Sequence, residues 1–91
     1  MGSKAVRARK DFILRDLGSQ HLVVPTGAAA REFHGFVRLN VSGAYLWGLL
    51  GERRTEDELA RALVERYGIG EGQAREDVAA FLRQVADFLD E

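Results

Sequence analysis

The pattern of hydrophobic and polar positions changes once along the chain, near Asn40. Before this residue, short runs of β-branched and aromatic residues alternate with turn residues, which is typical of strands. After it, apolar residues recur at spacings of three and four, which is typical of amphipathic helices. The sequence therefore predicts a β-rich first half and a helical second half.

The first half predicts a hairpin followed by one more strand. Gly18-Ser19 is a two-residue turn signal between two apolar runs, and Pro25 stops the second run. Residues 25–34 form a loop with room for one helical turn. We expect strands at Phe12–Leu17, Gln20–Val24 and Gly35–Leu39.

The second half predicts three helices, which we place at residues 41–50, 55–67 and 73–89. Asn40 is a good N-cap for the first helix. Thr55 and Glu58 have the spacing of a capping box at the start of the second. Gly51 and Gly68 are suited to end the first and second helices, because glycine tolerates the left-handed conformation found there.

The apolar positions indicate how these elements pack. The first helix is apolar on most sides, so we expect Trp47 in the core. The third helix carries one apolar stripe, formed by Val78, Phe81, Leu82, Val85, Phe88 and Leu89. The predicted fold is α+β and winged-helix-turn-helix-like, with a three-stranded antiparallel sheet followed by three helices (β-β-β-α-α-α).

Composition limits the possible functions. With 91 residues the chain makes one domain, 1–91, in which we expect residues 1–10 to be flexible. The absence of cysteine excludes disulfides and thiolate chemistry, and fits a cytoplasmic protein. No apolar run approaches the roughly 18 residues of a membrane span. Residues 1–40 hold seven basic and three acidic side chains, whereas residues 41–91 hold six and eleven.

The sequence offers little for catalysis. A zinc site needs three or four ligands, and His21, His34 and Glu32 are the only plausible set, so we expect no metal. Ser42 lacks the G-x-S-x-G context of an activated serine. We therefore expect a binding protein without catalytic residues or a cofactor.

Three segments and the helical tail resemble the PqqD family over residues 12–89. The quoted segments are Leu22–Pro25 (LVVP), Phe33–Asn40 (FHGFVRLN) and Ser42–Leu50 (SGAYLWGLL), and the tail agrees at Thr55, Glu58, Tyr67, Asp77, Val78, Phe81 and Leu82. The resemblance implies a RiPP recognition element, which binds the leader segment of a ribosomally synthesised precursor peptide. Such a domain presents the precursor to a modifying enzyme, either a radical S-adenosylmethionine enzyme or a leader peptidase.

In that family the leader adds as a strand to the third strand and lies against the third helix. An edge strand offers the unpaired backbone groups that such pairing needs. If Val37 and Leu39 face the helices, Phe36 and Arg38 face away. Arg38, Arg75 and Arg83 are also candidates for contacts with leader carboxylates. The expected peptide-binding residues are Phe36, Val37, Arg38, Leu39, Arg75, Val78, Phe81, Leu82 and Val85.

Two alternative functions stay open at this point. The same fold binds DNA when its third helix enters the major groove. That helix, however, carries two arginines and three acidic residues, Glu76, Asp77 and Asp87. The resulting net negative charge repels phosphate. The other alternative is a scaffold or dimerisation module without peptide specificity. We expect neither nucleic acid nor membrane as a partner.

Overall fold

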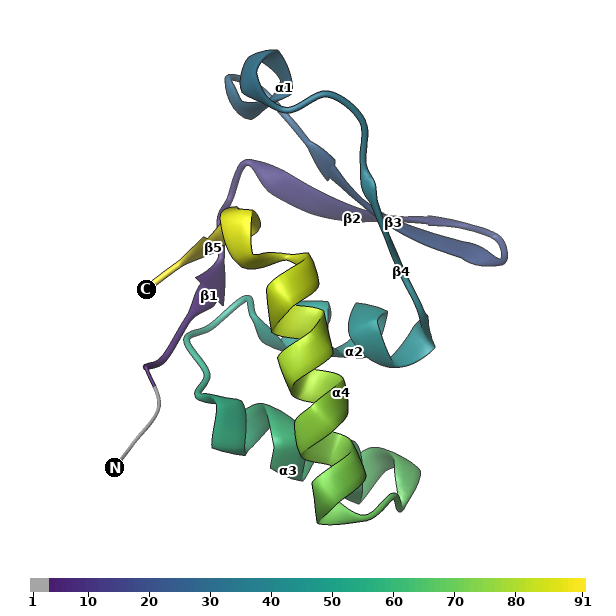
Figure 1. Ribbon diagram of the computed structural model, residues 1–91. Helices are drawn as coiled ribbons and strands as arrows, with labels where there is room; N and C mark the ends of the chain where they lie inside the picture. Colours follow the sequence, from purple (N-terminus) through teal and green to yellow (C-terminus); the bar gives the residue numbers. More distant parts are fainter. Residues whose placement is uncertain (1–3) are drawn as a thin grey trace.

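The computed structural model describes residues 4–91 and contains a small sheet beside a group of helices (Figure 1). The strands are β1 Arg7–Ala8, β2 Phe12–Leu17, β3 Gln20–Pro25, β4 Val37–Leu39 and β5 Leu89–Asp90. The helices are α1 Ala29–Glu32, α2 Val41–Leu49, α3 Glu56–Tyr67 and α4 Glu71–Gln84, followed by the 3₁₀ helix Ala86–Phe88. Within the described residues, no helix is long and apolar enough to cross a membrane.

The main sheet is three-stranded and antiparallel, with the order β2-β3-β4. This confirms the predicted α+β class and places β3 in the centre and β4 at an edge. Gly18 has a φ of 67°, whereas Ser19 does not have a positive φ, as in the type II′ turns that favour two-residue hairpins. The sheet, the short strand β4 and the helices below it are visible in Figure 1.

The core lies between one face of this sheet and helices α2, α3 and α4. Val23 from β3 and Leu39 from β4 meet Leu46 from α2 and Val78 from α4, and all four are buried. Trp47 is 6% exposed, which confirms its predicted place in the core. Burial of each large apolar side chain stabilises the fold by about 1.5–3 kcal/mol, so this cluster holds the sheet on the helices.

The two chain ends differ from the prediction. Residues 1–3 lie outside the described part, but residues 4–10, which were expected to be flexible, include β1, which pairs with β5. Helix α4 ends at Gln84 and not at Leu89, and the chain then turns through a 3₁₀ helix. This turn lets the Phe88 ring stack on Phe12, with 4.3 Å between ring centroids. Aromatic packing between distant segments thus competes with helix propensity here.

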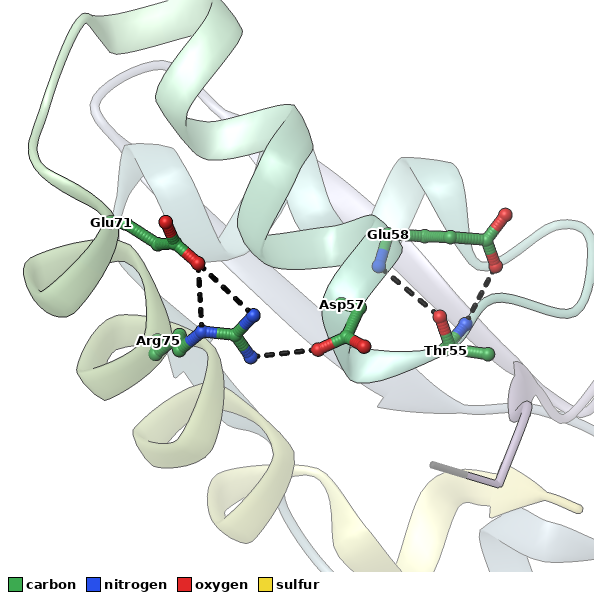
Figure 2. Close-up of polar contacts among 5 residues, drawn as sticks. All are labelled: Thr55, Asp57, Glu58, Glu71 and Arg75. Carbon is green, nitrogen blue, oxygen red and sulfur yellow. Dashed lines mark hydrogen bonds and ion pairs between the residues drawn. The ribbon is translucent and has the colours of Figure 1, made fainter. Parts of the chain in front are cut away.

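The helix starts follow the predicted chemistry. The Asn40 side chain accepts a hydrogen bond from the backbone N–H of Gly43 at 2.7 Å. At α3, the Thr55 hydroxyl accepts from the Glu58 N–H at 3.2 Å, and the Glu58 carboxylate accepts from the Thr55 N–H at 2.9 Å (Figure 2). Gly68 ends α3 in the left-handed conformation, with a φ of 66°. Both predicted N-caps and this predicted helix end are therefore confirmed.

The capping box yields a stability prediction. Thr55→Ala removes the hydroxyl that satisfies an otherwise free N–H at the start of α3, and it should lower the free energy of unfolding by about 0.5–2 kcal/mol. Urea denaturation measures this loss. Thr55→Ser keeps the hydroxyl and should retain most of the stability. Equal stability of Thr55→Ala and the wild type would contradict the role given to this cap.

Candidate binding site at the free edge of the sheet

The register of the sheet determines which backbone groups of β4 face solvent. The closing pair of the hairpin, Leu17 and Gln20, flanks a two-residue turn and is therefore a hydrogen-bonded pair. Because such pairs alternate along an antiparallel ladder, the backbone groups of Leu22 point toward β2. Leu22 lies opposite Arg38 on its other side. The N–H and C=O of Arg38 therefore point away from β3, to the free edge.

The C-terminal end of helix α4 contacts this edge directly. The Gln84 side-chain nitrogen donates a hydrogen bond to the Arg38 carbonyl oxygen at 2.7 Å. Gln84 is the last residue of α4, and its side chain is exposed. The edge carbonyl thus has a side-chain donor as its partner. No hydrogen bond of the Arg38 N–H to a side chain or loop occurs among residues 4–91.

A shallow hollow of about 130 Å³ continues from this contact, between the start of α2 and one side of α4. Its base is apolar, since Leu46 and Phe81 line it, and its rim is polar. The α4 residues that line it follow the spacing i, i+3, i+4 and i+7 of a helix face. The lining residues are Asn40, Ser42, Gly43, Leu46, Asp77, Ala80, Phe81 and Gln84.

The predicted residues of the third strand lie at this edge. Val37 and Leu39 pack toward the core, whereas Arg38 and Phe36 are exposed, so the expected alternation is confirmed. Phe36 is 55% exposed, directly before β4. Its ring is one of the few large apolar groups on the surface of the described chain. The strand thus offers both backbone groups and an apolar side chain beside them.

The predicted residues of α4 divide between the core and the hollow. Val78 and Val85 are 1% and 0% exposed, so they belong to the core. Leu82 is half-buried and packs against the same cluster. Phe81 is buried and also lines the hollow, so of these four it is the one placed beside the edge. Their contacts with a peptide stay predictions.

Arg75 lies on another side of α4. Each helical residue advances by about 100°, so Arg75 is roughly half a turn round the helix from Asp77 in the hollow. It donates to Asp57 of α3 at 2.7 Å and to Glu71 of its own helix at 3.2 Å (Figure 2). Its position favours a structural tie between α3 and α4 over the peptide contact expected from the sequence.

The same tie sets the acid response of one carboxylate. The hydrogen bond from Arg75, together with its positive charge, lowers the pKa of Asp57 from its ordinary value of 3.8. A carboxylate whose pKa is lower in the folded state contributes stability above the unfolded-state pKa. This contribution is lost as the pH falls through the lowered pKa.

Asp57→Asn tests this contribution. The variant should be less stable than the wild type at about pH 7, and the difference should shrink as the pH falls toward about 2, because protonated aspartate also lacks the charge. Urea denaturation at several pH values measures it. Glu56→Gln is the matched control, since it removes one charge from the same helical turn but no bond to Arg75. A difference that is constant with pH would contradict this account.

Several residues of the site were not found from the sequence. Asp77, Ala80 and Gln84 line the hollow from α4, and Asn40 lines it from the start of α2. The sequence did contain a sign of the α4 residues, because Asp77, Ala80 and Gln84 share a helix face adjacent to the apolar stripe. The apolar stripe itself identifies the core. For Gln84, the sequence carries no indication that its amide reaches β4, because this depends on where α4 lies.

The structure also bears on the other hypotheses. Within residues 4–91, no group of three or more histidine, aspartate or glutamate side chains is arranged to hold a metal ion. A DNA-reading role for α4 depends on its two arginines, Arg75 and Arg83. Arg75 is held by Asp57 and Glu71, and this arrangement does not favour phosphate contacts by that side chain.

The comparisons with known proteins agree with this fold. The family described as coenzyme PQQ synthesis protein D (PqqD) matches residues 13–87. The solved structure of TbiB1 in complex with the TbiA(beta) leader peptide matches with a TM-score of 0.68 and 18% sequence identity, over 92% of this chain and 94% of that one. At this identity the likeness shows a shared fold. Among curated proteins, none matches the chain.

Proposed function

The chain belongs to the PqqD family, and from this premise we propose that it binds the leader segment of a ribosomally synthesised precursor peptide. The leader adds to β4 as a fourth strand of the sheet. It lies between β4 and α4, with side chains directed toward the hollow at Phe81 and toward Phe36. The match to TbiB1, whose solved structure includes a leader peptide, supports this proposal.

One observation carries the proposal: the outward N–H and C=O of Arg38 at a sheet edge. A peptide residue opposite Arg38 accepts from its N–H and donates to its C=O, as in a hydrogen-bonded pair of an antiparallel sheet. Main-chain pairing of this kind tolerates many sequences, and adjacent pockets supply selectivity. The edge of β2 is the other free edge of the sheet, and a hollow of about 350 Å³ lies beside it, lined by Ile13 and Leu14 of β2 and by Trp47 of α2. The resemblance to the PqqD family, in which the leader adds to the third strand, favours the β4 edge.

The proposed role is recognition without catalysis. The protein holds the leader and leaves the remainder of the precursor extended toward a modifying enzyme, either a radical S-adenosylmethionine enzyme or a leader peptidase. The absence of cysteine fits the cytoplasm, where a newly made precursor is available. Strand β4 is short, so a peptide paired with it buries a limited area. An interface of limited area fits a complex that releases its peptide after the enzyme has acted.

Arg38→Pro tests the edge pairing. Because the Arg38 N–H points to solvent, proline at this position removes no bond between β3 and β4, and edge strands tolerate such a proline. The N–H offered to the peptide is lost. The lost bond and the unpaired peptide carbonyl should cost about 1–3 kcal/mol, or roughly five- to 150-fold in affinity. To obtain the probe, the genes adjacent to this one are searched for a short precursor reading frame, and a synthetic peptide of its leader segment is titrated by calorimetry.

Arg38→Ala is the matched control. Both variants lack the guanidinium, so the difference between them isolates the backbone N–H from any contact with a leader carboxylate. Thermal melting checks that both variants fold. The proposal is contradicted if Arg38→Pro is folded and binds the leader as tightly as Arg38→Ala, or if the wild type does not bind it.

A further inference from the structure

The hydrogen bond between Gln84 and Arg38 occupies one of the two backbone groups that the proposed function requires. The 2.7 Å between the Gln84 nitrogen and the Arg38 oxygen lies in the range of an ordinary N–H···O bond between strands. The Gln84 amide therefore already donates to the oxygen that the N–H of an incoming strand would use. A peptide N–H that approaches this oxygen from the same side must displace the amide.

We propose that Gln84 is a specificity-determining residue. Its amide donates a hydrogen bond to the outward carbonyl of Arg38 until a peptide N–H displaces it. This inference rests on the proposed leader binding and adds to it a condition on the ligand. A bound peptide must present a free backbone N–H opposite Arg38. A peptide with proline at that position cannot make the exchange, so Gln84 keeps its bond and the peptide gains nothing at this carbonyl.

The surroundings of Gln84 make the exchange feasible. Its side chain is exposed and ends α4, so it can turn into solvent when displaced. The bond joins two uncharged groups, and such bonds contribute little net free energy in contact with water. The neighbouring backbone group, the Arg38 N–H, has no competing side-chain acceptor among residues 4–91. A peptide can therefore first pair with that N–H and then take the carbonyl.

The bond also protects the free protein. An edge strand with unpaired groups is a template for pairing with another chain. Strand β4 has only three residues, and the amide of Gln84 covers the carbonyl at its middle. A second copy of the chain, like a peptide, would have to displace this amide before its own strand pairs there.

The test uses Gln84→Met and Gln84→Glu, which resemble glutamine in shape but donate no hydrogen bond. One variant is apolar and the other charged, so an effect that they share arises from the lost donor. Removing the competitor should tighten binding of the synthetic leader peptide about two- to tenfold, since a net hydrogen bond contributes about 0.5–1.5 kcal/mol. The same substitutions should not tighten binding of a leader that is N-methylated at the residue opposite Arg38, identified by scanning N-methylation.

A second readout reports the bond in the free protein. The carbonyl ¹³C resonance of Arg38 should move upfield in both variants, because its hydrogen-bond donor is gone. If the wild type binds the leader but both variants bind it equally or more weakly, Gln84 is not a competitor and this inference fails while the proposed function stands. If the wild type does not bind the leader, both fail.

Discussion

The two-residue turn at Gly18-Ser19 fixes the direction of every backbone group in the main sheet. It forces Leu17 and Gln20 into a hydrogen-bonded pair, and the alternation of the ladder carries this choice through β3 to β4. The side chains agree with this choice, because Val37 and Leu39 pack toward the core whereas Arg38 is exposed. The turn and the core packing therefore lead to the same set of backbone groups at the free edge of β4.

The helices give this edge its second side. Leu39 enters the core from β4, and the next residues begin α2 at once, so strand and helix approach closely. Gly43 permits this approach, because a Cβ there would lie 3.3 Å from the Leu39 Cβ and 3.0 Å from the Asn40 side-chain oxygen. Helix α4 is held against α3 by buried residues such as Leu63 and by the bond of Arg75 to Asp57. The hollow beside β4 results from this packing.

Local chemistry allowed much of the fold to be predicted from the sequence. The hairpin, the caps at Asn40 and Thr55 and the left-handed Gly68 each follow from a few adjacent residues. The pairing of β1 with β5 could not be predicted, because each strand has two residues and gains its stability from a distant partner. The end of α4 was placed too late for a similar reason, since the stacking of Phe88 on Phe12 joins opposite ends of the chain.

Resemblance and edge-strand physics pointed to β4 and α4, which the structure brings into contact, but the α4 residues were chosen by hydrophobicity. That criterion selects side chains such as Val85, which face the core, and passes over the polar Gln84, whose importance depends on its distance from β4. The helix face that lines this shallow hollow mixes polar and apolar side chains, so it has no clear hydrophobic pattern. Its members can be recognised once the packing partner of each face is known.

Amide hydrogen exchange shows directly whether a peptide pairs with β4. In the free protein, the outward amides at both edges, Arg38 on β4 and Leu14 and Asp16 on β2, should exchange rapidly. Saturation with the leader peptide should slow exchange at Arg38 and leave Leu14 and Asp16 unchanged. Protection at Leu14 and Asp16 with continued rapid exchange at Arg38 would place the peptide on the opposite edge and contradict the account.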